Sequence, residues 1–413
     1  MRMLSGRAAE ARVDELAERR SHLSAVEPVV TPIVEAVRRR GDPALRHYAA
    51  KWDGLAPRQS MRVPQSEIDG AWNTVTPALR ASLRETVTNI QRYCKWQAPR
   101  EWRRDRGGMS LGQLVRPLDS VGCYVPGGRH PLLSTLLMTV IPAQVAGVRQ
   151  IRVVSPHPRA EVLAAAALLG VAEFYRVGGA HAIAALAYGT SSISRVDKIV
   201  GPGNRYVTAA KKLVSFDCSI DFLAGPTEAV ICSSRGRAEF IAADLLAQAE
   251  HDPDALSVFI TTSQPLMQAV RSRVNRLVHH HPTARQSLGR NGAILLAPSR
   301  ERALAWVNQI APEHVTVDRE DVPFIRSAGS VFVGNYSAQA AGDYASGANH
   351  VLPTAGMARF RGGLHVLDFV KLIAVQELSS QALERIGPTV VCLANAEGLR
   401  AHAESVRARC KRA

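Results

Sequence analysis

Apolar positions in the first hundred residues recur at helical spacing. Between residues 1 and 50, and again between residues 66 and 96, apolar side chains return every three or four positions, as they do on one face of an amphipathic helix. The sequence Gly41-Asp42-Pro43 interrupts the first stretch in the manner of a turn. The pattern therefore predicts a helical N-terminal region.

From residue 120 onward, short runs rich in β-branched residues alternate with helical patterns. A first series of expected strands covers residues 121–125, 151–154, 174–177 and 198–200. A second series covers residues 229–232, 258–261, 293–296, 315–317 and 331–333. Strands separated by helices form parallel sheets with helices on both faces, so two similar α/β units are expected. Beyond them, residues 366–378 and the stretch from residue 395 are expected to be helical.

Composition limits the class of protein. The chain has 413 residues, of which 46% are hydrophobic and 21% charged, as is usual for a soluble globular enzyme of two domains. Its net charge of +15 comes mainly from arginines spread along the chain, and only 5% of its residues are aromatic. Without a recognisable nucleic-acid module, this charge favours a surface suited to anionic small molecules, or a compositional bias of the lineage, over nucleic acid as a partner.

Cysteine usage and hydropathy indicate where the protein works. The six cysteines show no CxxC pair or framework spacing, which favours a reducing, cytoplasmic setting. The first residues lack the apolar core of a signal peptide, and polar residues interrupt the longest apolar run, residues 131–148. We expect neither a membrane segment nor a membrane partner.

The segment DLLAQAEHDP carries the first candidate chemistry. Its Gln248 and His251 are three positions apart near an expected helix end, and residues at this spacing share one helix face. An amide oxygen and an imidazole nitrogen can therefore point at one metal ion, with further ligands from elsewhere. The downstream candidates are Glu313, His314, Asp343, His350, Glu397 and His402. Each of these, taken singly, is equally compatible with a helix cap or a surface position.

Two downstream clusters suit catalysis and metal binding. Glu313 and His314 are adjacent at an expected strand start, where histidine can accept a proton near neutral pH. Asp343 and His350 lie in a polar, glycine-containing stretch, and oxygen and imidazole ligands together suit zinc. The run of three histidines at residues 279–281 is interpreted as a solvated helix end.

Glycine-rich turns follow three of the expected strands, at residues 125–128, 177–180 and 201–204. Such turns let backbone N–H groups approach the phosphates of a dinucleotide. None of them matches GxGxxG, so the turns alone leave both cofactor binding and plain strand-to-helix connections open.

Taken together, the motifs resemble those of the histidinol dehydrogenase family, in the family's order, between about residues 120 and 405. The matching segments are VGCYVPGGRHPLLSTLLMTVIPAQVAGV, VDKIVGPGNRYVTAAK, IDFLAGPTEAV, ADLLAQAEHDPDA, APEHV, GDYASGANHVLPT, VQELS and EGLRAH. The resemblance implies a zinc-dependent enzyme that oxidises L-histidinol to L-histidine through histidinaldehyde, in two NAD-linked steps that end histidine biosynthesis. It also implies a homodimer with shared active sites.

The resemblance assigns roles motif by motif. One zinc ion per subunit would be bound by Gln248, His251 and Asp343, together with His402 of the partner subunit. The implied catalytic pair is Glu313 and His314. The implied substrate contacts are Thr227, His350 and Glu397. The implied NAD contacts are Tyr124, His181 and Asn204.

The expected fold class is α/β, with two Rossmann-like parallel-sheet domains, a helical N-terminal segment and a small C-terminal tail domain. Residues 1–20 are expected to form an N-terminal helical arm. Residues 21–118 and 226–364 would form the first α/β domain, with the metal and catalytic residues, and residues 119–225 the second, on the cofactor side. Residues 365–413 would form a tail exchanged with the partner subunit.

Two departures from the family pattern bear on affinity. His181 stands where the family has a glutamine that contacts the cofactor, and Thr227 stands where it has a serine that contacts the substrate. A paralogue acting on another primary alcohol is the main alternative, although Glu397 and His350 match positions that recognise histidinol. An inactive, basic nucleic-acid-binding protein is disfavoured, because the catalytic pair and all four ligands are present.

Overall fold

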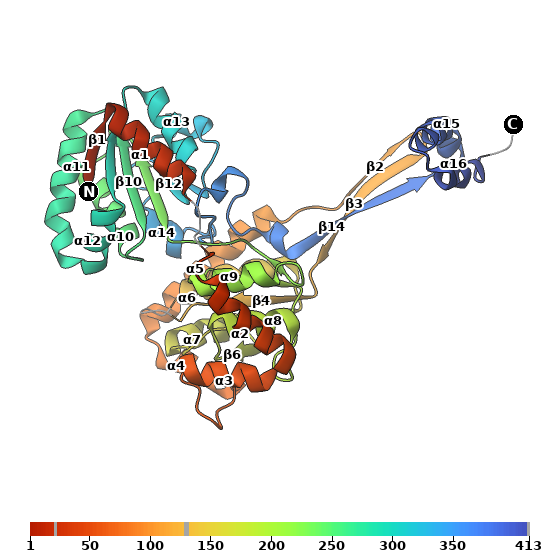
Figure 1. Ribbon diagram of the computed structural model, residues 1–413, viewed down its shortest axis with the longest axis horizontal. Helices are drawn as coiled ribbons and strands as arrows, with labels where there is room; N and C mark the ends of the chain where they lie inside the picture. Colours follow the sequence, from red (N-terminus) through yellow and green to blue (C-terminus); the bar gives the residue numbers. More distant parts are fainter. Residues whose placement is uncertain (20–22, 128–131, 411–413) are drawn as a thin grey trace.

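The computed structural model describes residues 1–19, 23–127 and 132–410. Its strands form a six-stranded sheet, a five-stranded sheet and a three-stranded sheet. Each of the two larger sheets forms the centre of an α/β domain, whereas the three-stranded sheet extends away from both domains as an arm (Figure 1). The boundary expected between residues 20 and 21 lies outside the described residues, as does Gly128 of the first glycine-rich turn.

The described strands of the five-stranded sheet pair in parallel, in the order β6-β5-β4-β7-β8. Its strands are β4 (Ser120–Tyr124), β5 (Gln150–Val154), β6 (Glu173–Tyr175), β7 (Lys198–Val200) and β8 (Ser219–Ile220). Its β4 is entirely buried, because helices cover both faces of the sheet.

Two groups of helices cover this sheet. One face packs against α4 (Gln65–Thr74), α5 (Pro77–Gln97), α6 (Leu133–Ala146) and α7 (Ala160–Leu168). The other face packs against α2 (Glu27–Arg40), α3 (Asp42–Trp52), α8 (Gly179–Tyr188) and α9 (Arg205–Val214). Residues 27–97 therefore belong to this domain, and the expected grouping of residues 21–118 with residues 226–364 was wrong. Helical periodicity shows that a helix has an apolar face, but not which sheet that face covers.

The six-stranded domain is also fully parallel, in the order β1-β11-β10-β9-β12-β13. Its strands are β1 (Arg2–Ser5), β9 (Glu228–Cys232), β10 (Leu256–Thr261), β11 (Ala293–Leu296), β12 (His314–Val317) and β13 (Ser330–Val333). One face packs against α1 (Gly6–Glu18) and α13 (Arg300–Ile310). The other face packs against α10 (Ala238–Ala249), α11 (Gln264–Leu277) and α12 (Pro282–Arg290).

The first residues differ from the expected helical arm, because β1 pairs with β11 and α1 packs on the same sheet. When β1 is left aside, both sheets have the same strand order. In each unit the first strand is central, the second and third strands lie on one side of it, and the fourth and fifth lie on the other side. This is the order of doubly wound, Rossmann-like sheets, and it confirms the predicted fold class.

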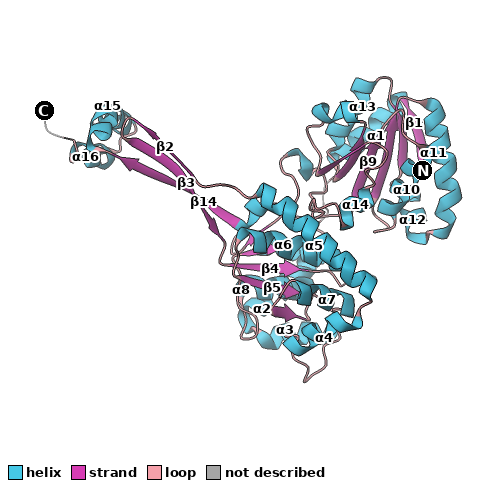
Figure 2. Cartoon of the chain, turned by 180° about the vertical axis from the view of Figure 1, so that it is seen from behind, coloured by secondary structure: helices cyan, strands magenta, loops and turns pink. Residues whose placement is uncertain are grey.

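The arm is the antiparallel sheet β14-β3-β2. It consists of β2 (Trp102–Arg106), β3 (Met109–Pro117) and β14 (Val370–Leu378), and it leads into α15 (Ser380–Ala396) and α16 (Arg400–Arg407) at its tip (Figure 2). The helix predicted over residues 366–378 was wrong: a short 3-10 turn, Val366–Phe369, precedes β14. Every residue of β14 pairs with β3, so a tertiary contact fixes its extended form.

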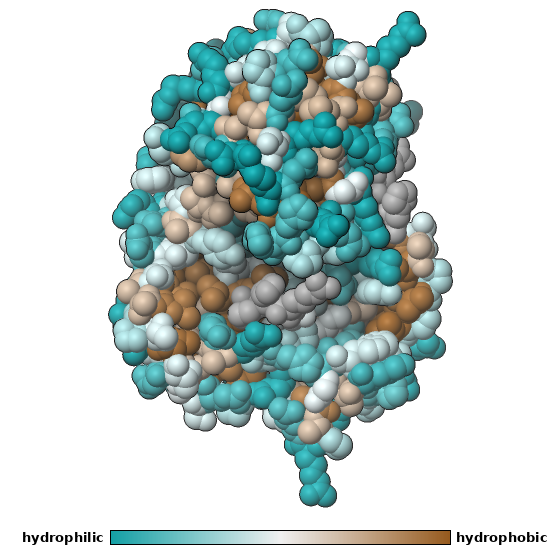
Figure 3. Space-filling view, turned by 90° about the vertical axis from the view of Figure 1, so that its left-hand side faces the viewer, coloured by the Kyte–Doolittle hydropathy of each residue, from teal (hydrophilic) through white to brown (hydrophobic). Residues whose placement is uncertain are grey.

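On the face seen in Figure 3, hydrophilic residues alternate with separate groups of hydrophobic ones. Across the part of the chain that the structure describes, no helix has both the length and the apolar character needed to span a membrane. The short helix α14 (Gln339–Tyr344) follows β13 and contacts α10 in the six-stranded domain.

Packing of the N-terminal helices predicts how the two domains respond to core truncation. Leu45→Ala in α3 should destabilise the five-stranded domain by about 2–5 kcal/mol, since it leaves a cavity in a closed core. Hydrogen exchange followed by mass spectrometry should then show faster exchange in β4, β5 and β7, but unchanged exchange in β9 and β12. The matched change Ile310→Ala in α13 should give the reverse pattern. Faster exchange in β9 after Leu45→Ala would contradict this division of the chain.

Candidate active site

A buried acid and imidazole cluster lies at the amino-terminal edge of the six-stranded sheet. His314 is the first residue of β12 and is 3% exposed. Its Nδ1 lies 3.6 Å from Glu313 Oε2, and its Nε2 lies 3.4 Å from Asp343 Oδ1. The imidazole stacks on the Phe332 ring, with 5.8 Å between centroids. His314 is thus held between two carboxylates, in a position suited to accepting or releasing a proton.

Burial and charge shift the pKa values of this cluster. Burial alone would lower the pKa of His314, but the carboxylates of Glu313 and Asp343 outweigh it and raise that pKa to about 10. Burial raises the pKa of the Glu313 carboxyl, against the opposing effect of His314. Burial would also raise the pKa of Asp343, yet the contact with His314 lowers it. Without a metal ion, His314 therefore keeps its proton near neutral pH.

Gln248 connects this cluster to α10. Its side chain is 1% exposed, and its Nε2 donates a hydrogen bond of 3.0 Å to Asp343 Oδ2. The amide oxygen Oε1 is buried without a hydrogen-bond partner, which costs free energy unless a ligand contacts it. A cation beside Asp343 would supply that contact, so the residues present fit a metal ion.

The neighbouring histidines complete the surroundings of Asp343. His350 Nδ1 lies 2.6 Å from the backbone oxygen of Asp343, and burial lowers the pKa of His350, which favours the neutral imidazole. His251 follows the end of α10 and is exposed, and its charge acts on both Asp343 and His350. The structure thus brings together Gln248, His251, Asp343 and His350, as well as Glu313 and His314.

Glu228 binds the cluster through Glu313. Its backbone N–H donates to Glu313 Oε2 at 2.9 Å, while its carboxylate accepts from Arg19 Nε at 2.6 Å and from the Ala355 N–H at 2.8 Å. Thr227 immediately precedes Glu228 and is half-buried, and its backbone oxygen accepts from Leu256. Sequence reasoning missed Glu228 and Arg19, although a glutamate opening a wholly apolar strand could have indicated a buried partner.

The expected cofactor contacts lie in the other domain, at the carboxyl-terminal edge of the five-stranded sheet. Tyr124 closes β4, and its hydroxyl accepts the Gly179 N–H at 3.2 Å. His181 is buried in α8, and its Nε2 lies 2.7 Å from Asp53 Oδ2, which also accepts the Gly178 N–H at 2.8 Å. His181 Nδ1 is buried and unpartnered, so it offers one polar atom for a bound molecule at this edge. Asp53 had no signal in the sequence.

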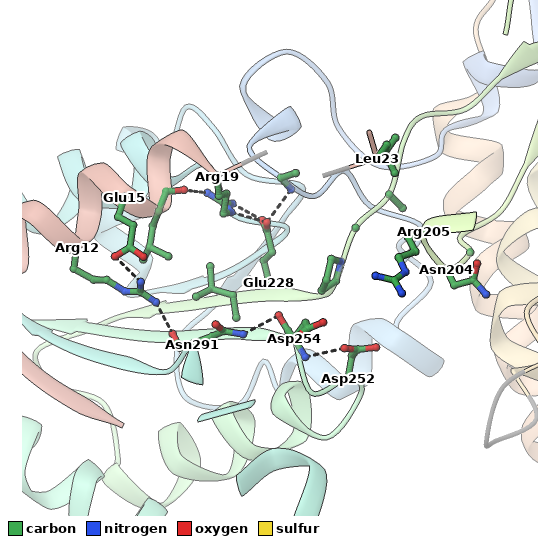
Figure 4. Close-up of a pocket in the computed structure, with 17 residues that line it drawn as sticks. Arg12, Glu15, Arg19, Leu23, Asn204, Arg205, Glu228, Asp252, Asp254 and Asn291 are labelled. Atoms are coloured by element: carbon green, nitrogen blue, oxygen red, sulfur yellow. Dashed lines mark hydrogen bonds and ion pairs between the residues drawn. The ribbon is translucent and has the colours of Figure 1, made fainter. Parts of the chain in front are cut away.

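Asn204 caps α9 and lines a cavity between the two domains. Its side-chain oxygen accepts the N–H groups of Tyr206 and Val207 at 3.0 and 3.2 Å. The cavity, of about 790 Å³, is also lined by Arg12 and Glu15 of α1 and by Glu228 (Figure 4). In Figure 4, dashed lines join Arg12 to Glu15 and Arg19 to Glu228. The cavity therefore has room for a ligand that touches both domains.

Two expected site residues lie elsewhere. Glu397 directly follows α15 and His402 lies in α16, both exposed at the tip of the arm and away from the two domains (Figure 1). Within residues 1–19, 23–127 and 132–410, no group of three His, Cys, Asp or Glu side chains is placed to hold a metal ion. One chain thus assembles Gln248, His251 and Asp343, but not the fourth expected ligand.

Comparison with known proteins places these residues in a family. Residues 16–410 match the histidinol dehydrogenase family. The chain belongs to that family. Histidinol dehydrogenase from Methanothermobacter thermautotrophicus is 46% identical over 97% of each chain. That of Rhizobium meliloti is 44% identical over 93% of this chain and 92% of its own.

A solved structure agrees with this assignment over the whole fold. The crystal structure of histidinol dehydrogenase from Elizabethkingia anophelis superposes with a TM-score of 0.94 at 33% identity, covering 99% of this chain and 98% of the other. The arm is included in that coverage. Like the other histidinol dehydrogenases, the chain is an oxidoreductase, and the predicted resemblance is confirmed.

The contact between Asp343 and His314 predicts a change in proton affinity. In metal-free protein, Asp343→Asn removes the negative charge beside His314 Nε2, so the pKa of His314 should fall below about 10. An NMR titration of the histidine ring protons, assigned with a His314→Gln variant, measures this pKa. Asp244→Asn is a matched control, since Asp244 is a half-buried carboxyl on α10. An unchanged pKa in Asp343→Asn would show that the two side chains do not interact in solution.

Proposed function

We propose that this protein is a zinc-dependent histidinol dehydrogenase that oxidises L-histidinol to L-histidine in two successive NAD-linked steps, through histidinaldehyde, as the last step of histidine biosynthesis. Family membership supports the substrate. The observation that carries the metal dependence is the buried, unpartnered Oε1 of Gln248 beside the Asp343 carboxylate. The free cysteines, all six within the described residues, suit the reducing cytoplasm where we place the enzyme.

Gln248, His251 and Asp343 would hold the zinc ion together with His402 of the partner subunit. When bound, zinc would hold the substrate and polarise its oxygen, which is positioning and Lewis-acid chemistry. Asp343 would then share its charge with the metal ion. Because the Asp343 carboxylate helps to keep His314 protonated, a cation bound to that carboxylate would lower the pKa of His314 toward the range of a general base.

His314 acts first as a base in this proposal. It takes the proton of the substrate hydroxyl while NAD accepts the hydride from the adjacent carbon, which gives histidinaldehyde. Glu313, held by the Glu228 N–H, then removes a proton from water as the water adds to the aldehyde. The protonated His314 gives its proton to the former carbonyl oxygen, which completes the hydrate and makes His314 a base again. His314 then takes a hydroxyl proton of the hydrate as a second NAD accepts the hydride, and the resulting carboxylic acid ionises to the carboxylate product. Both residues are buried, so the reactive aldehyde stays apart from bulk solvent.

The proposed substrate contacts lie beside the acid and imidazole cluster, and the proposed cofactor contacts lie in the five-stranded domain. Thr227 and His350 flank the cluster, and Glu397 of the partner subunit would meet the substrate from the arm. For the cofactor, Tyr124, His181 and Asn204 would contact NAD at the carboxyl edge of the five-stranded sheet, where doubly wound sheets bind dinucleotides. The unpartnered His181 Nδ1 supports this placement.

The arm supports a homodimer with shared sites. All five residues of β2 are exposed, as are most of those in β14, whereas a sheet of three strands depends on covering a hydrophobic face or packing against a helix for its stability. Large apolar side chains are exposed along the arm and its helices: Trp102, Leu111, Leu372, Ile373, Leu393 and Leu399. A second copy would bury them and would bring His402 and Glu397 to the cluster.

Mixing two inactive variants tests the shared site. His402→Asn and Gln248→Ala should each bind zinc poorly and form little NADH from L-histidinol. In a hybrid dimer, one site combines an intact Gln248 with an intact His402, so an equal mixture should recover about a quarter of the wild-type activity.

Subunit exchange should be verified with differently tagged chains before activity is read. A mixture of His402→Asn with Asp343→Ala should recover in the same way, whereas Gln248→Ala with Asp343→Ala should not, since both lesions fall in the same half-site. Failure of the first mixture to recover, with hybrids present, would contradict a ligand supplied by the partner subunit.

A further inference from the structure

A buried ion pair lies directly behind the turn that carries Asn204. Lys211 of α9 is 2% exposed and Asp221, just after β8, is 6% exposed. Lys211 Nζ contacts Asp221 Oδ1. Neither residue touches the acid and imidazole cluster, and the proposed reaction gives neither one a role. Two charges are thus buried together at the cofactor edge of the five-stranded domain.

Both charges bind the same residue of the turn at residues 201–204, here called the Gly201 turn. Asp221 Oδ2 accepts the Gly201 N–H at 2.8 Å, and Lys211 Nζ donates to the Gly201 carbonyl oxygen at 3.1 Å. The pair therefore satisfies both backbone polar groups of Gly201. Asp221 is itself fixed, because its N–H donates to Ile199 and Arg361 donates to its carbonyl oxygen.

The Gly201 turn has little freedom beyond these contacts. Gly201 adopts a φ of +115°, which side-chain-bearing residues rarely adopt, and a Cβ there would lie 2.2 Å from the Tyr124 backbone oxygen. The turn thus presses against the end of β4 on one side and begins α9 at Asn204 on the other. Tyr124 and Asn204 are two of the three proposed cofactor contacts, and the ion pair binds the glycine that packs against Tyr124 in the turn that leads to Asn204.

The energetics of the buried ion pair favour a role in shaping the Gly201 turn over a role in stabilising the fold. Removing two charges from water costs roughly as much as their attraction returns, so the attraction between the two charges adds little net stability to the fold. Apolar side chains, however, could not hold both the N–H and the carbonyl of Gly201 in fixed directions. We infer that Lys211 and Asp221 are positioning residues that hold the Gly201 turn in the shape that binds the dinucleotide, an inference that rests on the proposed NAD dependence.

Measuring NAD binding by calorimetry, beside zinc content and thermal unfolding, tests this inference. Lys211→Met should weaken NAD binding by about 10-fold or more, because a small displacement of the turn misplaces its contacts. KM for NAD should rise in parallel, while kcat at saturating NAD, KM for L-histidinol and zinc content change little. Lys212→Met is the matched control, since Lys212 is the next residue of α9 and pairs with Glu27 at the surface. It should bind NAD as the wild type does.

A second variant separates positioning from folding. Lys211→Met leaves Asp221 buried and unpaired, which can destabilise the protein. The double variant Lys211→Met with Asp221→Asn carries no buried charge and should stay folded, yet it should still bind NAD about 10-fold more weakly, since Gly201 loses the donor to its carbonyl. Wild-type NAD affinity in the folded double variant would overturn the positioning role alone. Absence of NAD binding in the zinc-loaded wild type would overturn the proposed function and this inference with it.

Discussion

The candidate site depends on the carboxylate of Asp343. One of its oxygens accepts a hydrogen bond from Gln248, and the other lies 3.4 Å from His314 Nε2. These side chains come from α10, β12 and α14, which are far apart in the sequence but packed together in the six-stranded domain. A buried carboxylate needs such partners, because its charge is costly to remove from water. The packing of this domain therefore sets both the geometry of the proposed metal site and the proton affinity of His314.

The two α/β domains divide the proposed chemistry between opposite sheet edges. The acid and imidazole cluster lies where β9 and β12 begin, whereas the proposed cofactor contacts lie where β4 ends and where turns follow β6 and β7. The cavity lined by Glu228 and Asn204 connects the two edges. The arm carries the remaining proposed site residues, Glu397 and His402, away from both domains (Figure 1). Their separation within one chain is the physical reason for proposing a dimer in which each arm completes the other subunit's site.

How much the sequence could predict depended on whether the signal was local. Alternating strands and helices predicted both parallel sheets, because buried strands and amphipathic helices carry their own patterns. The shared helix face predicted for Gln248 and His251 was wrong, because α10 ends at Ala249, so Gln248 is buried on the helix while His251 lies exposed beyond it. The family motifs include Glu313, His314 and Asp343, which the structure brings together. By contrast, residues 366–378 form β14 only because β3 lies beside them, and no pattern shows that the N-terminal helices cover the second sheet. Asp53 and Arg19 act through contacts with residues distant in the sequence, so single-chain patterns could not identify them.

The measurement that tests the central claim most directly is the number of NADH molecules formed per L-histidinol consumed. Zinc-loaded protein with excess NAD, at mildly alkaline pH, should form two NADH per substrate and release L-histidine without free aldehyde. A ratio of one, with histidinaldehyde accumulating, would contradict the assignment of Glu313 and His314 to both oxidations. No NADH from L-histidinol, in protein shown to be folded and zinc-loaded, would contradict the proposed substrate and point to another primary alcohol.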